Sequence, residues 1–356
     1  MKLDFCEVFD DYTSRCRKIP KEEYLSNGKY IVIDQGKNSI AGYTNVDDGL
    51  FEDVPAIVFG DHTRIIKYVD EPFFLGADGV KLLKSKIKDA NYKYLYYALR
   101  NARIPDTGYN RHFKWLKEIS LEYKDAESQK NIVKILDTVT NIIELCKAEL
   151  SELDNLIKAR FVEMFGDPVR NTKMWHTEKL YVIAPINKYK GNVDVIDGKV
   201  WLLNLDMIES CTGNILGILY EYENRITSST IKFDENCVLY SKLRPYLNKV
   251  VIPKMRGYAT SELISMSAEN INKYFLANLL RQDSFVDFSN STSYGAKMPR
   301  ASMDTIKNFD VIMPPIELQN QFATFVHQVN KSKVEVKKAL DEAQLLFDSL
   351  MQKYFG

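Results

Sequence analysis

The residues best suited to contact a phosphate or the edge of a base gather in the segment YSKLRPYLNKVVIPKMRGY, residues 240–258. It contains five lysines or arginines, three tyrosines and no acidic residue. Arginine can place two donors on a guanine or a phosphate, lysine offers a point charge, and tyrosine can stack or donate a hydrogen bond. The alternative interpretation is a solvated strand edge protected by its lysines. The candidate nucleic-acid contacts in this segment are Lys242, Arg244, Tyr246 and Lys249.

Candidates of the same kind occur earlier in the chain, in the turn GDHTR (60–64) and the glycine-punctuated loop QGKNSIAGYTN (35–45). Asparagine is suited to adenine, because its amide can donate to one atom of that base and accept from another. A plain hairpin is the simpler interpretation of the loop taken by itself. The candidate contacts in these two segments are Lys37, Asn38, Tyr43, His62, Thr63 and Arg64.

Two further loops, TGYNRHF (107–113) and SYGAKMPRAS (293–302), each combine a glycine with an arginine. Loops of this type can bring backbone amides and a guanidinium close to a phosphate. They could equally be ordinary connections between elements. Their candidate contacts are Asn110, Arg111, Lys297 and Arg300.

The sequence offers no recognisable catalytic machinery. The four histidines show no metal-ligand spacing, the five cysteines form no CxxC pair, and no GxGxxG, GxxxxGK[ST] or GxSxG motif occurs. A self-sufficient adenine methyltransferase would need an Asn/Asp-Pro-Pro-aromatic motif, but Pro-Pro occurs only in MPPIE. We therefore expect no catalytic residue, no cofactor and no metal in this chain.

The totals are those of an ordinary globular protein with two domains. The chain has 356 residues, is 45% hydrophobic and carries 48 basic and 48 acidic residues, so its net charge indicates no particular partner. Unpaired cysteines suit a reducing compartment. The N-terminus lacks the apolar segment of a signal peptide, and no run approaches the roughly 18 apolar residues of a membrane span. We expect a cytoplasmic protein without a membrane segment.

A gapless internal repeat organises the chain. The segment ESQKNIVKILDTVTNIIELCKAELSELDNLIKARFVEMFG (127–166) aligns with ELQNQFATFVHQVNKSKVEVKKALDEAQLLFDSLMQKYFG (317–356) at a shift of 190 residues, the difference between 356 and 166. In both copies apolar residues recur at alternating spacings of four and three, which is typical of a coiled-coil seam. Each copy therefore predicts a helix of about 39 residues, or about 58 Å in length.

The predicted helix-pair seam contains one polar position, Lys333, which weakens packing locally but can fix the register of the two helices. Because the copies match in length and pattern, we expect the helices to pack against each other. Twofold pseudo-symmetry then requires an antiparallel pair. The seam consists of Ile132, Leu136, Val139, Ile143, Cys146, Leu150, Leu153 and Ile157, with Phe322, Val326, Val329, Lys333, Val336, Leu340, Ala343 and Phe347.

The segments outside the repeat are rich in predicted strands. Short apolar runs such as YIVID, AIVFG and CVLYS are bounded by Gly, Pro, Asn and Asp, and one helical patch occurs in each segment. Residues 58–84 parallel residues 239–267 in their order of strand, polar-basic turn, strand and small-residue turn. LKEISLEY and IKNFDVIM each predict a short strand before a long helix.

The predicted fold class is therefore α+β, with two β-rich domains separated by a long antiparallel two-helix coiled coil and related by pseudo-twofold symmetry. The predicted boundaries are 1–123 and 167–313 for the β-rich domains, and 124–166 and 314–356 for the helices.

The motifs VIMPPIELQNQF and LFDSLMQKYFG, their earlier copies AESQKNIVKILD and LDNLIKARFVEMFGD, and YSKLRPYLNKV between them resemble the specificity subunits of type I restriction-modification systems. The resemblance covers essentially the whole chain, and its helix motifs are the more specific ones. One departure is KDAESQK, where the family usually has Pro-Pro before Glu and Gln. We therefore expect the start of the first helix to be frayed or shifted.

This resemblance implies a subunit that recognises double-stranded DNA and is not itself an enzyme. It implies that the β-rich domains are target-recognition domains, each for one half of a bipartite sequence, and that the helices set the gap between the halves. It also implies two methyltransferase subunits, which bring S-adenosylmethionine and base flipping, and motor-nuclease subunits in the full complex.

Two other interpretations compete with this one. The chain could be a non-catalytic scaffold whose coiled coil joins two protein-binding β domains, with basic turns that only confer solubility. A self-sufficient methyltransferase or nuclease is disfavoured by the missing cofactor and metal motifs. Salt-dependent binding to duplex DNA in the presence of a methyltransferase partner separates the first two possibilities.

Overall fold

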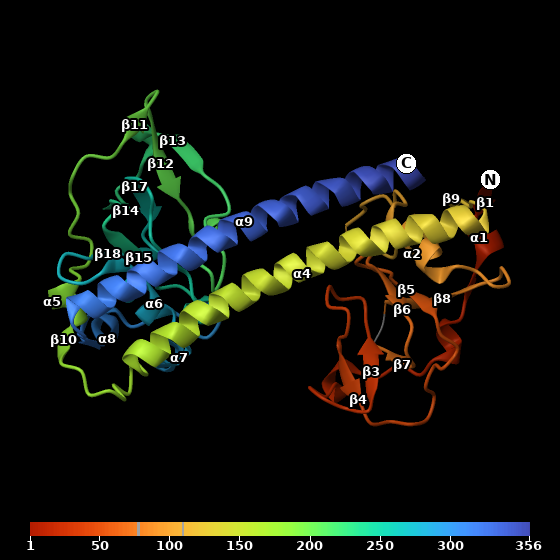
Figure 1. Cartoon of the computed structure of the whole chain (residues 1–356), viewed down its shortest axis with the longest axis horizontal. Helices are drawn as coiled ribbons and strands as arrows, with labels where there is room; N and C mark the ends of the chain where they lie inside the picture. Colours follow the sequence, from red (N-terminus) through yellow and green to blue (C-terminus); the bar gives the residue numbers. More distant parts are fainter. Residues whose placement is uncertain (77–78, 109) are drawn as a thin grey trace. The chain divides into compact units, whose positions relative to one another are not determined.

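The computed structural model describes residues 1–76, 79–108 and 110–356. The chain forms two compact units (Figure 1). The first unit comprises Met1–Cys146 and Ala339–Gly356, and the second unit comprises Lys147–Lys338. Each unit therefore contains one β-rich domain together with part of both long helices.

The first unit is built on short strands arranged in three small sheets. Their orders are β2-β8-β5-β6, β4-β3-β7 and β1-β9. The strands are β1 (Lys2–Asp4), β2 (Phe9–Asp11), β3 (Tyr30–Ile33), β4 (Gly42–Thr44), β5 (Ala56–Gly60), β6 (Ile66–Val69), β7 (Phe73–Leu75), β8 (Val80–Ser85) and β9 (Ser120–Glu122). The short helices are α1 (Phe5–Val8), α2 (Tyr92–Arg100) and α3 (Phe113–Leu116).

The second unit has a comparable set of sheets, with orders β16-β15-β18, β11-β12-β17-β14 and β10-β19, and with β13 paired to β12. The strands are β10 (Thr177–Lys179), β11 (Val195–Ile196), β12 (Lys199–Leu203), β13 (Leu219–Tyr222), β14 (Thr230–Phe233), β15 (Cys237–Ser241), β16 (Val250–Val251), β17 (Gly257–Thr260), β18 (Leu263–Ser267) and β19 (Asp310–Ile312). The helices are α5 (Leu180–Ile183), α6 (Lys273–Arg281), α7 (Asp283–Ser291) and α8 (Met303–Lys307).

The two units share a strand plan, as the sequence predicted. In the first unit β5 lies between β6 and β8 and pairs antiparallel with both, and in the second unit β15 does the same with β16 and β18. Among the described residues, each unit also contains a parallel strand pair, β3 with β7 and β12 with β17. The strand before each long helix pairs with the first strand of its own domain, so the domain is closed where the helix begins. The α+β fold class is confirmed.

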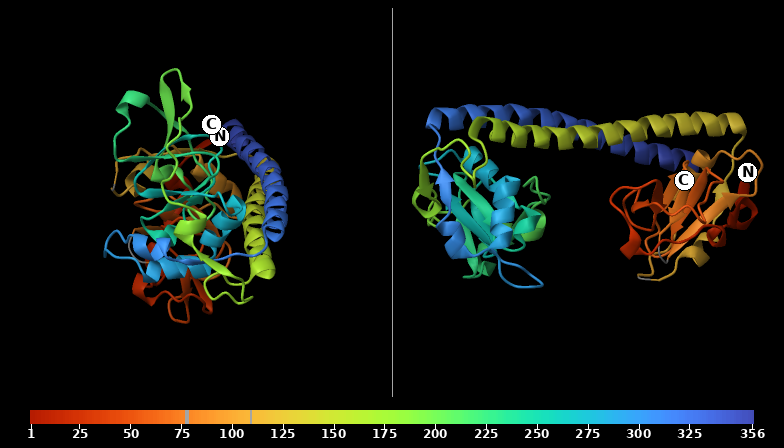
Figure 2. Two further views of the ribbon diagram at one scale, coloured as in Figure 1. Left: turned by 90° about the vertical axis from the view of Figure 1, so that its left-hand side faces the viewer. Right: turned by 90° about the horizontal axis from the view of Figure 1, so that it is seen from below.

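The long helices are α4 (Ala126–Phe165) and α9 (Ile316–Phe355), each of 40 residues. In each unit they lie together on one side of the β-rich domain (Figure 2). In the second unit Asp154 pairs with Lys333, while Phe161 and Phe165 further along α4 contact Phe322 near the start of α9. Higher residue numbers on α4 therefore lie beside lower residue numbers on α9, so the two helices are antiparallel.

The ends of the seam are better buried than its middle. Ten seam residues are less than 9% exposed, namely Ile132, Leu136, Val139, Ile143, Ile157, Phe322, Val326, Val329, Ala343 and Phe347. They belong to the apolar cores of the two units. The remaining six, Cys146, Leu150, Leu153, Lys333, Val336 and Leu340, are only partly buried. The helix ends are thus held by the β-rich domains as well as by each other.

The expectation of a frayed or shifted start for the first helix is wrong. α4 begins at Ala126, the position equivalent to Ile316 at the start of α9. Asp125 replaces the second proline and caps the helix, because its carboxylate accepts hydrogen bonds from the Ser128 amide at 2.9 Å and the Ser128 hydroxyl at 2.7 Å. A capping carboxylate thus stabilises the start of the first helix at the position that proline occupies in the second copy.

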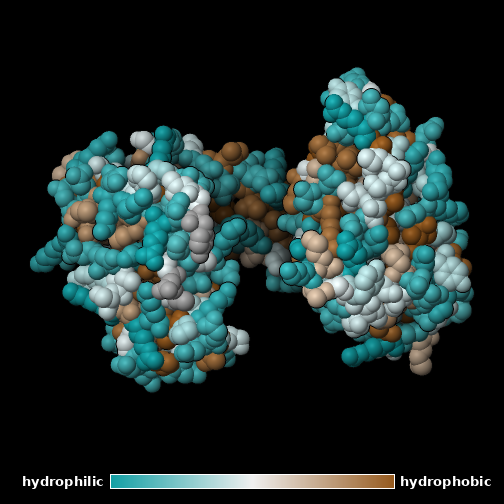
Figure 3. Space-filling model, turned by 180° about the vertical axis from the view of Figure 1, so that it is seen from behind, coloured by the Kyte–Doolittle hydropathy of each residue, from teal (hydrophilic) through white to brown (hydrophobic). Residues whose placement is uncertain are grey.

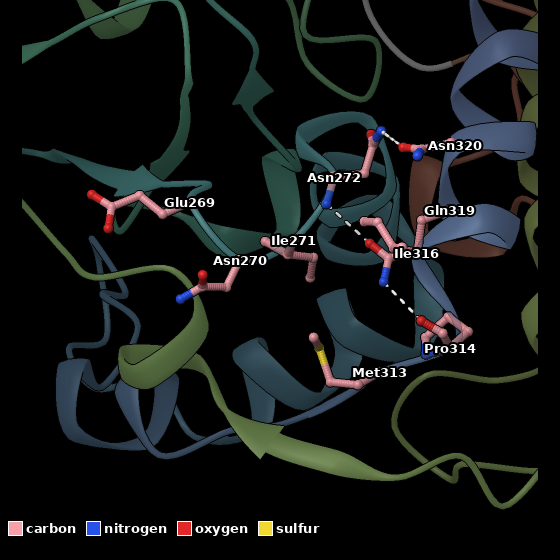
Figure 4. A pocket seen from close by; sticks show the side chains of 9 residues that line it. All are labelled: Glu269, Asn270, Ile271, Asn272, Met313, Pro314, Ile316, Gln319 and Asn320. Atoms are coloured by element: carbon pink, nitrogen blue, oxygen red, sulfur yellow. Dashed lines mark hydrogen bonds between the residues drawn. The ribbon is translucent and has the colours of Figure 1, made fainter.

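A glutamine at the equivalent position secures the start of each long helix. Gln129 Nε2 donates to the Lys124 carbonyl at 2.8 Å, and the equivalent Gln319 Nε2 donates to the Pro314 carbonyl at 2.9 Å. Gln319 Oε1 also accepts from the Asn272 amide at 2.9 Å, which ties α9 to the start of α6 (Figure 4). Both glutamines are almost fully buried. The repeated Gln in the sequence is therefore structural.

On the face shown in Figure 3, hydrophilic side chains cover most of each unit, and apolar side chains appear among them. Most large apolar side chains are instead buried in separate cores. The first unit buries Phe59, Phe73 and Phe74, and the second buries Phe233 and Phe275. Each unit thus has the core expected of a domain that folds around its own strands.

Candidate nucleic-acid interface

The turn GDHTR of the first unit begins where the buried strand β5 ends. The Gly60 amide donates to the Ile65 carbonyl at 2.8 Å and the Arg64 amide donates to the Gly60 carbonyl at 2.7 Å, which closes the turn. Arg64 has a φ of 61°, in the left-handed region that a residue with a side chain occupies at a cost of roughly 1 kcal/mol. Such strained positions are concentrated at functional sites.

The loop before α3 packs onto this turn through a buried aspartate. The Asp61 carboxylate accepts the Phe113 amide at 2.7 Å, and the Asp61 carbonyl accepts the His112 amide at 2.8 Å. His112 is fully buried and its Nδ1 lies 3.0 Å from the same carbonyl. The two segments are therefore held together by hydrogen bonds within the protein, one between backbone groups and two that involve a side chain.

The loop that follows β3 joins the same place. Gln35 Oε1 accepts the His62 amide at 3.2 Å, and its carbonyl accepts the Thr63 hydroxyl at 2.7 Å. Lys67 Nζ donates to the Asn38 carbonyl at 2.6 Å, while the side chains of Lys37 and Asn38 are exposed. Three segments predicted separately from the sequence are thus neighbours in the first unit.

Other candidates of the first unit have partners within the protein. Arg64 Nη2 lies 2.7 Å from Asp106 Oδ2, and the Gly108 amide together with Arg64 holds the pKa of Asp106 below its usual range. The Asn110 side chain donates to the Thr107 carbonyl, and the Asn110 carbonyl lies 3.2 Å from His62 Nδ1. Arg111 is exposed beside this cluster. Tyr109 of the same loop lies outside the described residues.

Tyr43 lies away from this cluster. It stands on β4, where its backbone pairs with Leu25 in both directions at 2.9 Å and its ring packs against an apolar core of the domain. The tyrosine therefore has a structural explanation, as the hairpin interpretation proposed.

The second unit repeats the arrangement with different residues. The basic turn begins where β15 ends at Ser241, and Arg244 again has a positive φ, of 50°. The Arg244 amide donates to the Pro299 carbonyl at 2.7 Å, and the Ala301 amide donates to the Lys242 carbonyl at 2.9 Å. The segments that carry Lys242, Arg244 and Arg300 are thus neighbours, as their counterparts are in the first unit.

The candidate side chains of this second cluster differ in their exposure to solvent. Tyr246 is half exposed at the surface of the turn and Lys297 is exposed in the loop. Lys249 is directed inward, where its ammonium donates to the Leu205 carbonyl at 2.8 Å and burial lowers its pKa. Its environment is that of a residue that supports the turn.

Four residues that shape the two clusters are not among the contacts predicted from the sequence, namely Gln35, Asp61, Asp106 and Glu262. Three of them are acidic, and the residues predicted as DNA contacts include no acidic side chain. Gln35 and Asp61 lie inside the motifs QGKNSIAGYTN and GDHTR, and an acid within an otherwise basic turn was the available signal. Glu262 lies within the repeated segment 239–267 but outside its basic turn, so its position in the sequence does not link it to Arg300.

The described part of the chain contains no group of three or more His, Cys, Asp or Glu residues placed to hold a metal ion. Within the same residues, no helix is both long and apolar enough to cross a membrane.

Comparison with known proteins gives concordant results. Residues 3–155 and 184–343 match the family model of the type I restriction modification DNA specificity domain. The chain is 23% identical over 308 residues to the type I restriction enzyme EcoDI specificity subunit of Escherichia coli, which covers 74% of this chain and 69% of the relative. Each of the two matched stretches begins in a β-rich domain and ends within a long helix.

Two solved structures share the fold. The S subunit of the type I restriction-modification system from M. genitalium has a TM-score of 0.57 at 16% identity, covering 100% of this chain and 96% of that one. A chain from a structure on complex assembly and conformational transition of the type I R-M system has a TM-score of 0.53 at 11% identity, covering 100% and 97%. The likeness spans both units and both helices.

Proposed function

Because the chain belongs to the type I restriction-modification DNA specificity family, whose members are the non-catalytic specificity subunits of these complexes, we propose that its two domains recognise the two halves of a bipartite DNA target. The first unit would contact one half and the second unit the other. The target would be asymmetric, because the two domains present different side chains.

The observation that carries this proposal is the repeated cluster at the end of each central strand. In both units a turn with an arginine at positive φ meets the loop that leads to the long helix. The shared backbone plan supports a shared task, and the different side chains support different base sequences. The proposed DNA contacts are Lys37, Asn38, His62, Thr63, Arg64, Asn110 and Arg111 in the first unit, and Lys242, Arg244, Tyr246, Lys297 and Arg300 in the second. Tyr43 and Lys249, which the sequence also predicted as contacts, have partners inside the protein and are left out of the proposal.

We assign the two helices a double task, setting the length of the unread gap and binding two methyltransferase subunits. Equivalent positions support two equal sites: Leu156 on α4 and Leu346 on α9, 190 residues apart, are 47% and 51% exposed. Large apolar side chains exposed on a long helix are suited to a protein partner. Those subunits would supply S-adenosylmethionine and the methylation chemistry, and motor-nuclease subunits would complete the complex in the cytoplasm.

Mapping methylated adenines in the genome of the host cell tests this proposal directly. We expect two short specified sequences separated by a gap of constant length and free composition. Binding of the purified complex to a duplex with that target should fall steeply as salt is raised, because lysines and arginines replace the counterions of the phosphates. A continuous target, or no affinity for duplex DNA, would contradict the proposal and favour a protein-interaction scaffold.

A further inference from the structure

Arg300 of the second unit is held by a carboxylate on one edge of its guanidinium. Its Nη2 donates to Glu262 Oε1 at 2.8 Å, and its Nε lies 3.3 Å from Glu262 Oε2. These two contacts occupy the Nε–Nη2 edge in the side-on bidentate arrangement of arginine and carboxylate. Such a pair fixes the plane of the guanidinium as well as its position.

The opposite edge of the same guanidinium remains available. Among the described residues, Nη1 of Arg300 makes no hydrogen bond, and Nη2 keeps its second proton. A guanine presents two acceptors, N7 and O6, in its major-groove edge, and two adjacent N–H groups of arginine match them. One arginine can therefore hold Glu262 with one edge and a guanine with the other.

The backbone of Arg300 is as well fixed as its side chain. The Arg300 amide donates to the Tyr294 carbonyl at 2.8 Å, and the Tyr294 amide donates back to Arg300 at 3.0 Å. The adjacent Pro299 and Ala301 are bonded to the turn of Arg244 and Lys242. The arginine is thus oriented before any ligand arrives, which lowers the entropy that binding must overcome.

Charge favours a base over a phosphate as the partner of this arginine. The Arg300 guanidinium lowers the pKa of Glu262, so this carboxylate stays ionised at neutral pH. A phosphate placed against Arg300 would meet the negative charge of Glu262 a few ångströms away, whereas the neutral guanine edge would not. Lys297 is exposed in the same loop and forms no ion pair with a carboxylate among the described residues, so it is suited to a phosphate.

We propose that Arg300 recognises a guanine in the half of the target bound by the second unit, and that Glu262 is the positioning residue that aims it. This inference rests on the proposed function, because it assumes that the second unit contacts the major groove. It adds the identity of one base and a role for an acidic residue.

The test uses the complex with its methyltransferase subunits and compares Glu262→Gln, Arg300→Ala, Arg300→Lys and Lys297→Ala. Each is titrated against its mapped target duplex, against duplexes in which each guanine of that half-site is replaced in turn by 7-deazaguanine, and against an unrelated duplex. Glu235→Gln is the matched control, since it breaks the Arg256–Glu235 pair beyond the other end of β15 in the same unit.

In the wild-type complex, we expect 7-deazaguanine at one particular position to weaken binding, and Arg300→Ala and Arg300→Lys should abolish that effect. Both variants should bind the unmodified target about 5- to 150-fold more weakly than the wild type does. Glu262→Gln should reduce the same discrimination while affinity for the unrelated duplex stays equal or rises, because a negative charge is removed from a DNA-facing surface. A variant that merely misfolded would lose affinity for both duplexes. Lys297→Ala should weaken binding to both duplexes by a similar factor.

If Arg300→Ala lowered the affinity for target and unrelated DNA by the same factor, this residue would be a phosphate contact and the inference would be overturned. A second half-site without any G·C pair, or a Glu262→Gln variant that matches Glu235→Gln in every titration, would also overturn it. A wild-type complex that distinguishes no base in this half-site would instead refute the proposed function itself.

Discussion

At the scale of single residues, both clusters show how a surface charge is made into an oriented donor. Arg64 and Arg300 each hold a carboxylate, Asp106 and Glu262 respectively. Arg244 differs, because its Nε is buried and has no hydrogen-bond partner among the described residues. A buried donor without a partner is costly, so a ligand that reached it would gain more than one that met a solvated arginine.

We therefore predict that Arg244→Ala affects only the half-site bound by the second unit. The loss should be about 1–3 kcal/mol, which is typical of one good contact to a base. Binding to duplexes altered in one half-site at a time measures it, with Arg64→Ala as the reciprocal control in the first unit. Equal losses at both half-sites would show that the domains do not work separately.

A second prediction at this scale concerns Asp61, whose buried carboxylate accepts the Phe113 amide. Asp61→Ala leaves that amide unpaired and should cost about 1–3 kcal/mol of the free energy of unfolding. It should also loosen the contact between the turn and the loop of Asn110. Urea unfolding reports the stability change, and recognition of the first half-site should weaken while the second is retained.

At the scale of elements, the long helices depend on a few polar contacts at fixed places. Lys333 interrupts the apolar seam, and its Nζ lies 2.6 Å from Asp154 Oδ1 with side-chain exposures of 14% and 35%. The equivalent seam position in the first copy is Ile143, which is buried in the first unit. The same position thus carries a charge pair in one unit and an apolar contact in the other. This difference distinguishes the two ends of a repeat that would otherwise be interchangeable.

We predict that Asp154→Ala destabilises the second unit, by about 3 kcal/mol at most because the pair is only partly buried. The double change Asp154→Leu with Lys333→Ile, which copies the first unit at the seam position, should recover most of that loss. Thermal unfolding of the complex measures both. Equal stability of the single variant and the wild type would mean that the pair has no structural role.

The helix starts give a graded prediction, because Gln319 makes one more hydrogen bond to a backbone group than Gln129 does in the described structure. Gln319→Ala should cost about 2 kcal/mol or more, and Gln129→Ala about 1 kcal/mol. Chemical denaturation of the two variants side by side provides the comparison. The reverse order would show that Asn272 finds another acceptor.

At the scale of the whole molecule, each unit contains part of α4 and part of α9, and both helices pass from one unit to the other. Any change in helix length between the units therefore has to act on both domains. Deleting four residues within 145–155 of α4, with a matching deletion within 335–345 of α9, removes about 6 Å of helix. The two deletions keep the antiparallel pair in register with itself.

We predict that this double deletion shortens the unread gap by about two base pairs, at about 3.4 Å per base pair, and leaves both half-sites unchanged. Methylome mapping of cells that carry the variant measures the gap. A deletion of four residues in α4 alone should also change the preferred gap, but with lower stability. An unchanged gap in the double variant would refute the helices as the spacer.

The sequence by itself determined the parts of this protein that depend on local periodicity. The four-three pattern from Ile132 to Ile157 and the shift of 190 residues were enough for two long helices of equal length, because helix formation links residues only three or four positions apart. Alternating apolar runs likewise predicted the strands and their repeated order around GDHTR and SKLRP. The start of α4 differs from the expectation because the Asp125 carboxylate caps the helix where the family pattern has a proline.

Tertiary structure alone decided which charges remain available to a ligand. Glu262 meets Arg300 across 38 positions and Asp154 meets Lys333 across 179, while Lys249 turns inward to a carbonyl 44 positions away. No local pattern contains these pairings, because strand register and helix packing bring the partners together from distant parts of the chain. A lysine or arginine in the sequence is therefore a candidate, and only its surroundings in the fold determine whether its donors face the protein or the DNA.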